Sequence, residues 1–348
     1  MSETIRWGVM GTARIAEKVG AAIRAVEGAE LAAVASRVAE RAATWAEAHG
    51  ATRSYGSYQE LLDDDELDAI YIPLPPSMHH AWALRTAESG KHLLCEKPVA
   101  TNAAQVEEMV AAFAQANRQL MDGVMWVHTP RAADMLNHIN SGALGSLRRV
   151  TSAFSFFMES WLENNVVATG GAATLADAMA REIRLQREFA CGALGDLGWY
   201  NVRATLWAFG GLPERVYATA RYRNDVEINT SATLWYDHDR MASFDCGFDQ
   251  TWRKWFEVIG TEGSLVCDDF VNAWDQQRPR YWVHDGAARP TEHISEPRIQ
   301  EQCMVRRFCE IARTAQLDDQ WPKIALANRR VIDAIDQSAR TGKIVELS

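Results

Sequence analysis

Between residues 5 and 123 the sequence alternates short β-rich runs with helical stretches. The helical stretches cover 14–27, 38–49, 77–89 and 102–117, and the runs between them read IRWGVM, LAAVAS, DAIYIPL, KHLLCE and QLMDGV. Strands that alternate with helices predict βαβ units, and therefore a parallel sheet covered by helices on both faces. In such a doubly wound, Rossmann-type sheet, ligands bind outside the carboxyl ends of the strands. The residues that directly follow each run are therefore candidates for a binding site.

The pattern changes after a helix expected at 130–141. Five segments between residues 148 and 267 alternate polar and apolar residues with period two, which predicts a largely antiparallel sheet. Helices are expected near 193–209, 299–316 and 323–341. A chain of 348 residues is too long for one ordinary core. We therefore expect an α/β dinucleotide-binding domain over 1–124 and an α+β substrate and oligomerisation domain over 125–348, whose C-terminal helices can pack back on the first domain.

Charge and composition narrow the class of partner. The net charge is −10 and Lys and Arg form no cluster, which argues against nucleic acid and anionic membranes as partners. No signal-like N-terminus and no run of about 18 apolar residues is present, so we expect a cytoplasmic protein with a small-molecule substrate. The six cysteines are scattered and are interpreted as reduced structural thiols. No metal site is expected, since the adjacent pair His79 and His80 cannot both face one ion easily.

The turn GVMGTARIAEK follows the first run and opens a helix. A dinucleotide-binding turn has the pattern G-x-G-x-x-G/A, and this one supplies Gly11, Ala13 and Ala16. Alanine suits the third position, where helix and strand pack closely, but fits the second only partly because its methyl group takes space and restricts positive φ. By itself the turn is equally compatible with a cofactor site and with an ordinary strand-to-helix connection. Its candidate cofactor-binding residues are Gly11, Thr12, Ala13, Arg14 and Ile15.

The end of the second run bears on the choice of cofactor. An acidic residue there usually accepts from the ribose of NAD, whereas a basic residue accommodates the 2′-phosphate of NADP. This chain has Ser36 and Arg37, with Arg41 one helical turn later. The pattern favours NADP over NAD; the alternative is that both arginines are solvated helix residues.

Two later strand ends supply further candidate binding residues at the carboxyl edge of the expected parallel sheet. Leu74, Pro75 and His79 follow the run DAIYIPL, and Glu96, Lys97 and Pro98 follow KHLLCE. A lysine in that position points into the cleft, beside the expected place of the nicotinamide. An ordinary solvated lysine is the alternative, but the following proline restrains the backbone and favours a functional role.

These motifs together resemble the glucose-fructose oxidoreductase/inositol dehydrogenase (Gfo/Idh/MocA) family. The resemblance rests on the E-K-P corner and the glycine turn, and on YGSYQELL, IPLPPSMHH, SGKHLLCEKPVA, SGALGSLRRV and GALGDLGWYN. In that family a helix of the second domain carries D-x-x-x-H or D-x-x-x-Y. Here Asp196 and Tyr200 supply the tyrosine form, spaced to share one helix face. This form is similar to dimeric dihydrodiol dehydrogenases, glucose-fructose oxidoreductases and NADP-dependent xylose dehydrogenases.

The resemblance implies catalytic roles for Lys97, Asp196 and Tyr200. Tyrosine has a reference pKa near 10, and a nearby ammonium lowers it, so Lys97 beside Tyr200 suits a proton acceptor. Asp196 would orient the substrate or Lys97. Whether Lys97 or Tyr200 transfers the proton stays open. The implied activity is NADP-dependent hydride transfer at a secondary alcohol or carbonyl of a cyclic sugar or polyol; the alternatives are a trans-dihydrodiol dehydrogenase and a catalytically silent cofactor-binding sensor.

The chain also departs from the family pattern. The family's P-N-x-x-H reads PPSMH here, and its M-Y-R-x-H-P reads MWVHTP, so that Trp126 and His128 either line the sugar side or pack. Trp7 is interpreted as a core residue. The glycine- and alanine-rich stretch 164–190 is either a mobile lid or a surface excursion. The second sheet has one face without helices, which predicts a homodimer or homotetramer through that face.

Overall fold

The computed structural model describes residues 4–189, 191–314 and 316–347. It divides into two compact units, one formed by Met1–Thr129 with Arg298–Leu326 and the other by Pro130–Pro297 with Ala327–Ser348. The division therefore follows Thr129, slightly beyond the expected residue 124. The segment Arg298–Leu326 belongs with the first unit although it comes late in the sequence.

Unit 1 contains a six-stranded parallel sheet of order β3-β2-β1-β4-β5-β6, which confirms the doubly wound fold. Its strands are β1 (Ile5–Met10), β2 (Ala29–Ala35), β3 (Arg53–Tyr55), β4 (Ala69–Ile72), β5 (His92–Cys95) and β6 (Leu120–Asp122). Its connecting helices are α1 (Arg14–Ala25), α2 (Ala39–His49), α3 (Tyr58–Leu62), α4 (Pro76–Glu88) and α5 (Ala103–Gln115). The strand order reverses between β1 and β4, and the crevice at such a reversal is where ligands bind in this fold.

A late helix completes the core of unit 1. Helix α10 (Gln300–Ala312) packs against α1, and its Phe308 ring lies 4.7 Å from the ring of Trp7 on β1. Both side chains are fully buried in one apolar cluster. The prediction that Trp7 is a core residue is therefore confirmed.

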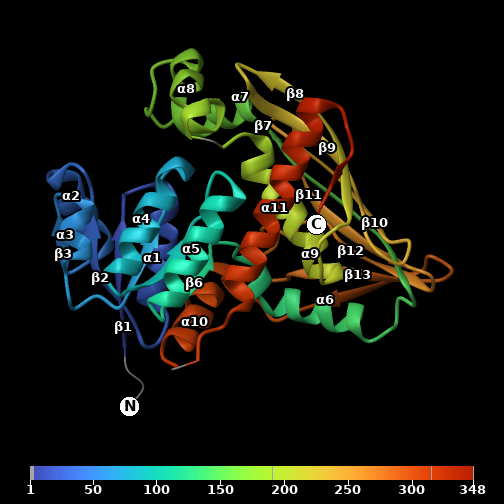
Figure 1. Cartoon of the computed structure of the whole chain (residues 1–348), viewed down its shortest axis with the longest axis horizontal. Coiled ribbons are helices and arrows are strands. Elements are labelled where there is room, and N and C mark those ends of the chain that lie inside the picture. Colours follow the sequence, from blue (N-terminus) through green and yellow to red (C-terminus); the bar gives the residue numbers. More distant parts are fainter. Residues whose placement is uncertain (1–3, 190, 315, 348) are drawn as a thin grey trace. The chain divides into compact units, whose positions relative to one another are not determined.

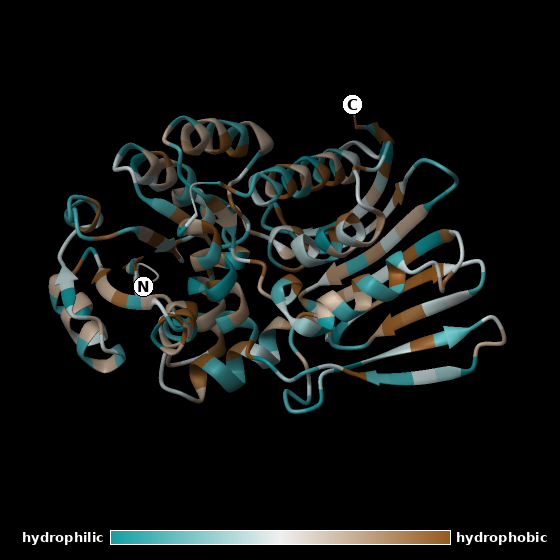
Figure 2. Ribbon diagram, turned by 90° about the horizontal axis from the view of Figure 1, so that it is seen from below, coloured by the Kyte–Doolittle hydropathy of each residue, from teal (hydrophilic) through white to brown (hydrophobic). Residues whose placement is uncertain are grey.

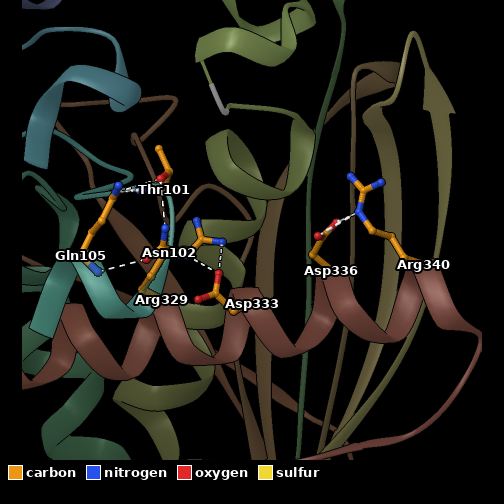
Figure 3. A network of polar contacts seen from close by, with 7 residues as sticks. All are labelled: Thr101, Asn102, Gln105, Arg329, Asp333, Asp336 and Arg340. Carbon is orange, nitrogen blue, oxygen red and sulfur yellow. Dashed lines mark hydrogen bonds and ion pairs between the residues drawn. The ribbon is translucent and has the colours of Figure 1, made fainter.

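The start of α5 is held by side-chain caps just after the Glu96–Pro98 corner. Asn102 Oδ1 accepts from the amide of Gln105 at 3.0 Å, and Gln105 Oε1 accepts from the hydroxyl of Thr101 at 2.8 Å. Figure 3 shows this network, together with the (i, i+4) pairs Arg329–Asp333 and Asp336–Arg340 on α11 (Gln320–Thr341). A capping side chain satisfies an amide that the helix cannot pair internally, so the chain after the corner begins a fixed helix.

Unit 2 is built on a nine-stranded sheet of order β14-β13-β12-β11-β7-β10-β9-β8-β15. It is mostly antiparallel, as expected, but β7 and β10 pair in parallel, so the sheet is mixed. The strands are β7 (Leu147–Phe157), β8 (Arg215–Arg223), β9 (Val226–Trp235), β10 (Met241–Gly247), β11 (Asp249–Gly260), β12 (Gly263–Cys267), β13 (Arg280–Asp285), β14 (Pro290–Ile294) and β15 (Val345–Glu346). Helix α6 (Pro130–Asn140) precedes the sheet in sequence.

The two faces of this sheet differ. Helix α9 (Trp199–Phe209) packs on β7, β10 and β11, and the buried side chains of β10, such as Ala242 and Phe244, belong to that covered side. The strands are banded in hydropathy in Figure 2, as a sheet with one solvated face requires. On the other side, Thr151, Thr233 and Trp255 help line a polar depression of about 380 Å³.

The segment between β7 and α9 is not a plain loop. It forms α7 (Met158–Leu162), a π-helical turn Glu163–Val167, α8 (Leu175–Arg181) and two short 3-10 turns, Ile183–Leu185 and Arg187–Phe189. Helices α7 and α8 contact each other, as Figure 1 shows. Residue 190 lies outside the described residues.

None of the helices within residues 4–189, 191–314 and 316–347 is long and apolar enough to cross a membrane. Within the same ranges, no cluster of three or more His, Cys, Asp or Glu side chains could hold a metal ion. All six cysteines are buried.

Candidate functional site

The turn between β1 and α1 has the backbone that a dinucleotide turn needs. Gly11 has φ +115°, and a Cβ atom there would lie 2.9 Å from the Cδ2 atom of Leu74, so only glycine fits. Ala13 is the N-cap of α1, with an extended backbone at φ −65° and ψ 154°, and no side chain caps the first turn of this helix. Thr12 and Ile15 are half-exposed, and Ala13 and Arg14 are exposed. The amides of the turn and the helix dipole therefore suit an anion such as a pyrophosphate.

The carboxyl end of β2 carries positive charge next to this turn. Ser36 is buried, and its hydroxyl accepts from the amide of Val38 at 3.3 Å, whereas Arg37 and Arg41 are exposed. Burial raises the pKa of the Tyr58 phenol, and the nearby Arg37 guanidinium opposes that rise. The phenol oxygen of Tyr58 lies 4.0 Å from the Cβ position of Gly11. Tyr58 is therefore near both Arg37 and the phosphate turn, a position that the sequence analysis missed.

His79 connects two loops at the carboxyl edge of the sheet. Its ring is fully buried, with Nε2 at 2.7 Å from the carbonyl oxygen of Leu74 and Nδ1 at 2.9 Å from that of Pro98. Burial lowers the pKa of His79, against the effect of its carbonyl partners. The ring has no surface to offer a cofactor, so its contribution is to tie the loop after β4 to the loop after β5. Leu74 is buried and Pro75 half-exposed.

A buried carboxylate anchors the Glu96–Lys97–Pro98 corner. Glu96 is only 8% exposed; its Oε1 accepts from the hydroxyl of Tyr71 at 2.7 Å and its Oε2 from the amide of Lys97 at 3.2 Å. Burial raises the pKa of Glu96, and the Lys97 ammonium and the Tyr71 hydroxyl oppose that rise. The Lys97–Pro98 peptide bond is cis, and Lys97 itself is half-buried. The backbone of Lys97 is therefore held by the buried Glu96 carboxyl group, at the same carboxyl edge of the sheet as the Gly11 turn.

The two aromatic candidates after β6 differ in burial, since Trp126 is buried and His128 is half-exposed. Trp126 is 2% exposed, which leaves almost no surface for a substrate. The ring of His128 lies 4.6 Å from that of Trp321, with an interplanar angle of 35°. Of the two readings left open by the sequence, burial favours packing for Trp126.

In unit 2 the pair Asp196 and Tyr200 lies where a π-helical turn, Leu194–Gly198, leads into α9. The amide of Asp196 donates to the carbonyl of Gly192 at 2.9 Å, and a Cβ atom at Gly192 would collide with the carboxylate of Glu227. Asp196 is 8% exposed and Tyr200 half-exposed, with its ring 5.5 Å from that of Phe154. Turns of this kind occur often at functional sites.

An arginine that the sequence analysis did not select joins this pair. Arg184 Nε lies 3.0 Å from Asp196 Oδ2, and its guanidinium lies 5.0 Å above the ring of Trp161. Burial opposes the charge of Arg184, but its carboxylate neighbours Asp196 and Glu182 raise its pKa overall, with Tyr200 adding to the same effect. A permanently charged guanidinium near a buried carboxylate and a half-exposed phenol can stabilise negative charge on both.

Comparison with known proteins agrees with these features. A model of an oxidoreductase family with an NAD-binding Rossmann fold matches residues 5–124, and a model of the GFO/IDH/MocA C-terminal domain matches residues 133–266. The chain belongs to the Gfo/Idh/MocA family. The resemblance inferred from the sequence motifs is confirmed.

Relatives in this family include named enzymes. The chain is 33% identical to D-xylose 1-dehydrogenase (NADP(+)) 2 of Haloferax volcanii over 98% of this chain and 99% of the relative. It is 29% identical to human trans-1,2-dihydrobenzene-1,2-diol dehydrogenase over 75% of this chain and 73% of that protein. Among solved structures it is similar to KijD10, a 3-ketoreductase from Actinomadura kijaniata in complex with NADP and TDP-benzene. That likeness has a TM-score of 0.85 and 26% identity, and it covers 97% of this chain and 98% of the other.

The residues around the candidate site that sequence reasoning missed are Tyr58, Tyr71 and Arg184. Each acts through a contact between segments that are far apart in sequence or irregular, so no spacing rule identifies them. The only local signal for Arg184 was its position shortly before GALGDLGWY.

Proposed function

We propose that this chain is an NADP-dependent oxidoreductase that transfers a hydride between the nicotinamide and a secondary alcohol or carbonyl carbon of a cyclic sugar or related polyol. The observation that carries the proposal is the position of Lys97 on its buried Glu96 base, at the same carboxyl edge as the Gly11 turn. An ammonium group beside a dinucleotide site is suited to bind the oxygen of a reacting alcohol. A named xylose dehydrogenase and a sugar 3-ketoreductase among the relatives support the same substrate class.

The residues of unit 1 fit NADP. Gly11 and the uncapped start of α1 suit the pyrophosphate, and the end of β2 presents Arg37 and Arg41 with no acidic residue between Ser36 and Arg41 except Glu40. Glu40 lies in the first turn of α2, beyond the position that directly follows the strand. Guanidinium groups bind phosphate with short, charge-assisted hydrogen bonds, so they favour the 2′-phosphate over a bare ribose hydroxyl.

The proposed chemistry assigns each protein group one task. In the oxidative direction the carbinol carbon loses a hydride and its hydroxyl loses a proton, and the bound nicotinamide supplies the hydride acceptor. Tyr200 accepts the proton at its phenolate oxygen, and Lys97 donates a hydrogen bond to the substrate oxygen. Asp196 orients the substrate hydroxyl. In the reductive direction Tyr200 returns the proton to the carbonyl oxygen.

The test is a turnover screen followed by two variants. Purified protein with NADP⁺ is assayed on pentoses, hexoses, inositols and trans-dihydrodiols by the absorbance of the reduced nicotinamide. On the best substrate, Tyr200→Phe and Lys97→Ala should each lower kcat at least about tenfold, because each removes a group that acts on the transferred proton or the substrate oxygen.

Two controls make the result interpretable. Lys343→Ala, at an exposed lysine, and Tyr217→Phe, on β8, should leave kcat within about twofold. If neither active-site variant lowers turnover, the catalytic assignment is wrong. If NADPH binds and no alcohol in the screen is oxidised, the sensor alternative replaces the proposal, and preferred turnover of a dihydrodiol moves the substrate class to trans-dihydrodiols.

A further inference from the structure

The segment between β7 and α9 places one charged side chain on the Asp196/Tyr200 pair. Arg184, in the turn Ile183–Leu185, contacts Asp196 through Nε at 3.0 Å. All of these residues belong to unit 2. The contact therefore links the stretch 164–190, for which the sequence alone suggested either a lid or a surface excursion, to the residues proposed to handle the proton.

Arg184 is held in this position from three sides. Its guanidinium lies 5.0 Å above the ring of Trp161 and 3.5 Å from Oε1 of Glu182, and its amide donates to the same carboxyl oxygen at 3.1 Å. Trp161 in turn packs against Phe156 of β7, with ring centroids 6.1 Å apart. A stacked, hydrogen-bonded guanidinium loses little freedom when it pairs with a carboxylate, so the orientation of the pair is fixed.

The charged and titratable groups near Arg184 indicate its effect on the ionisation of Tyr200. The titratable groups that interact with Arg184 are Asp196, Glu182, Cys191 and Tyr200. The Asp196 side chain is 11% exposed and comes four residues before Tyr200, where the π-helical turn leads into α9. A carboxylate near a phenol disfavours the phenolate by like-charge repulsion. A guanidinium paired with that carboxylate cancels the repulsion and attracts the phenolate directly.

We propose that the segment 164–190 serves the reaction by supplying Arg184, a positioning residue that fixes the Asp196 carboxylate and stabilises the ionised form of Tyr200. This inference rests on the proposed function in so far as Tyr200 is the proton acceptor. The physical claim about the phenol stands apart from turnover, and the experiment measures it directly.

The experiment follows the ionisation of Tyr200 by nuclear magnetic resonance. The full chain is labelled with tyrosine carrying ¹³C at the phenolic carbon; it has eight tyrosines, so the Tyr200 signal is assigned by its loss in Tyr200→Phe. The pKa of Tyr200 is then read from the titration in the wild type, Arg184→Gln and Arg184→Lys. Arg184→Gln should raise it by about one unit, a tenfold fall in the ionised fraction at a given pH. Arg184→Lys, which keeps the charge, should recover at least half of that shift.

A matched arginine provides the control. Arg187 belongs to the same segment, and its side chain is 78% exposed and paired with Asp225, so Arg187→Gln should leave the Tyr200 titration unchanged. With an oxidisable substrate, the alkaline rise of kcat in Arg184→Gln should move to higher pH by the same amount, while KM changes less than kcat.

Two results overturn the inference. The first is a Tyr200 titration that is the same in Arg184→Gln as in the wild type. The second is an equal change in Arg184→Gln, Arg184→Lys and Arg187→Gln, which would show a general disturbance of the segment. If the titration shifts as expected and no alcohol is oxidised, the positioning role holds and the proposed function fails, so the two are distinguished.

Discussion

Replacing Tyr71 with Phe removes one hydroxyl from the base of the Lys97 corner. Tyr71 is fully buried and donates to Oε1 of Glu96 at 2.7 Å, while the amide of Lys97 donates to Oε2 at 3.2 Å. Phenylalanine keeps the ring, so the variant leaves no large cavity and tests the hydrogen bond. A hydrogen bond to a charged group contributes about 1.5–3 kcal/mol to stability. We therefore expect the free energy of unfolding to fall by about 2 kcal/mol wherever Glu96 is ionised.

The pH dependence of this loss follows from the pKa of Glu96. Burial already raises that pKa, and without the Tyr71 donor it rises further. Between its unfolded and folded pKa values such a carboxyl binds more protons in the folded chain, so the free energy of unfolding falls as pH rises through that interval. The interval extends to higher pH in Tyr71→Phe. The two proteins should therefore be similar in stability below the pKa of Glu96 in the wild type and diverge above it.

Scanning calorimetry over a series of pH values measures the effect and separates transitions of units that unfold independently. A domain of about 150 residues or more loses about 2–4 °C in Tm per kcal/mol, so the variant should melt about 4–8 °C lower at alkaline pH. Tyr217→Phe, at a side chain that is 39% exposed, is the control and should show no such dependence. A decrease in Tm that is equal at every pH, or no decrease at any pH, would refute the reasoning about the buried carboxylate.

Two further predictions concern the cofactor and the open sheet face. Arg37→Ala should weaken NADPH binding about tenfold in a fluorescence titration and leave the affinity for NADH within about twofold. The reason is that the variant loses a phosphate contact of about 1.4 kcal/mol. Equal affinities of the wild type for NADPH and NADH would contradict the assignment. The chain should sediment as a homodimer or homotetramer that associates through the sheet face containing Thr151, Thr233 and Trp255. Thr233→Arg should dissociate this oligomer, since an unpaired charge would be buried in the interface. A monomeric mass for the wild type would exclude this interface.

Long elements with clear periodicity were predictable from the sequence. The strands β1, β2, β4 and β5 and the helices α1, α2 and α4 lie within a few residues of their expected positions, because each carries a continuous apolar run or an amphipathic stripe. The elements that were missed include β3 (three residues), α3 (five), α7 (five) and β15 (two), together with β13 and β14. Short elements contain too few residues for a period to be seen, and their structure depends on the neighbours they pair with.

The site shows the same division between local and tertiary information. Gly11, Lys97, Asp196 and Tyr200 belong to local motifs, so sequence reasoning selected them. Tyr71, by contrast, is 25 residues from Glu96 in sequence, and the two meet only because β4 and β5 are neighbours in the sheet. Sequence patterns therefore identify the side chains proposed to do the chemistry, whereas the side chains that position them are brought into contact only by the fold.

The glycine-poor turn is the clearest case in which structure resolves an ambiguous motif. Of the positions where the fingerprint has glycine, only Gly11 has a backbone that other residues avoid, with φ +115°. Ala13 has φ −65°, a value that every residue adopts, and Ala16 is completely buried against the sheet, where a methyl group fills space. The second and third positions of the pattern therefore require only a small side chain, whereas the first requires a residue that can adopt positive φ. A turn that keeps the conformational glycine and replaces the other two with the smallest side chain retains the backbone geometry of a dinucleotide site, so the departure from G-x-G-x-x-G is no argument against NADP binding.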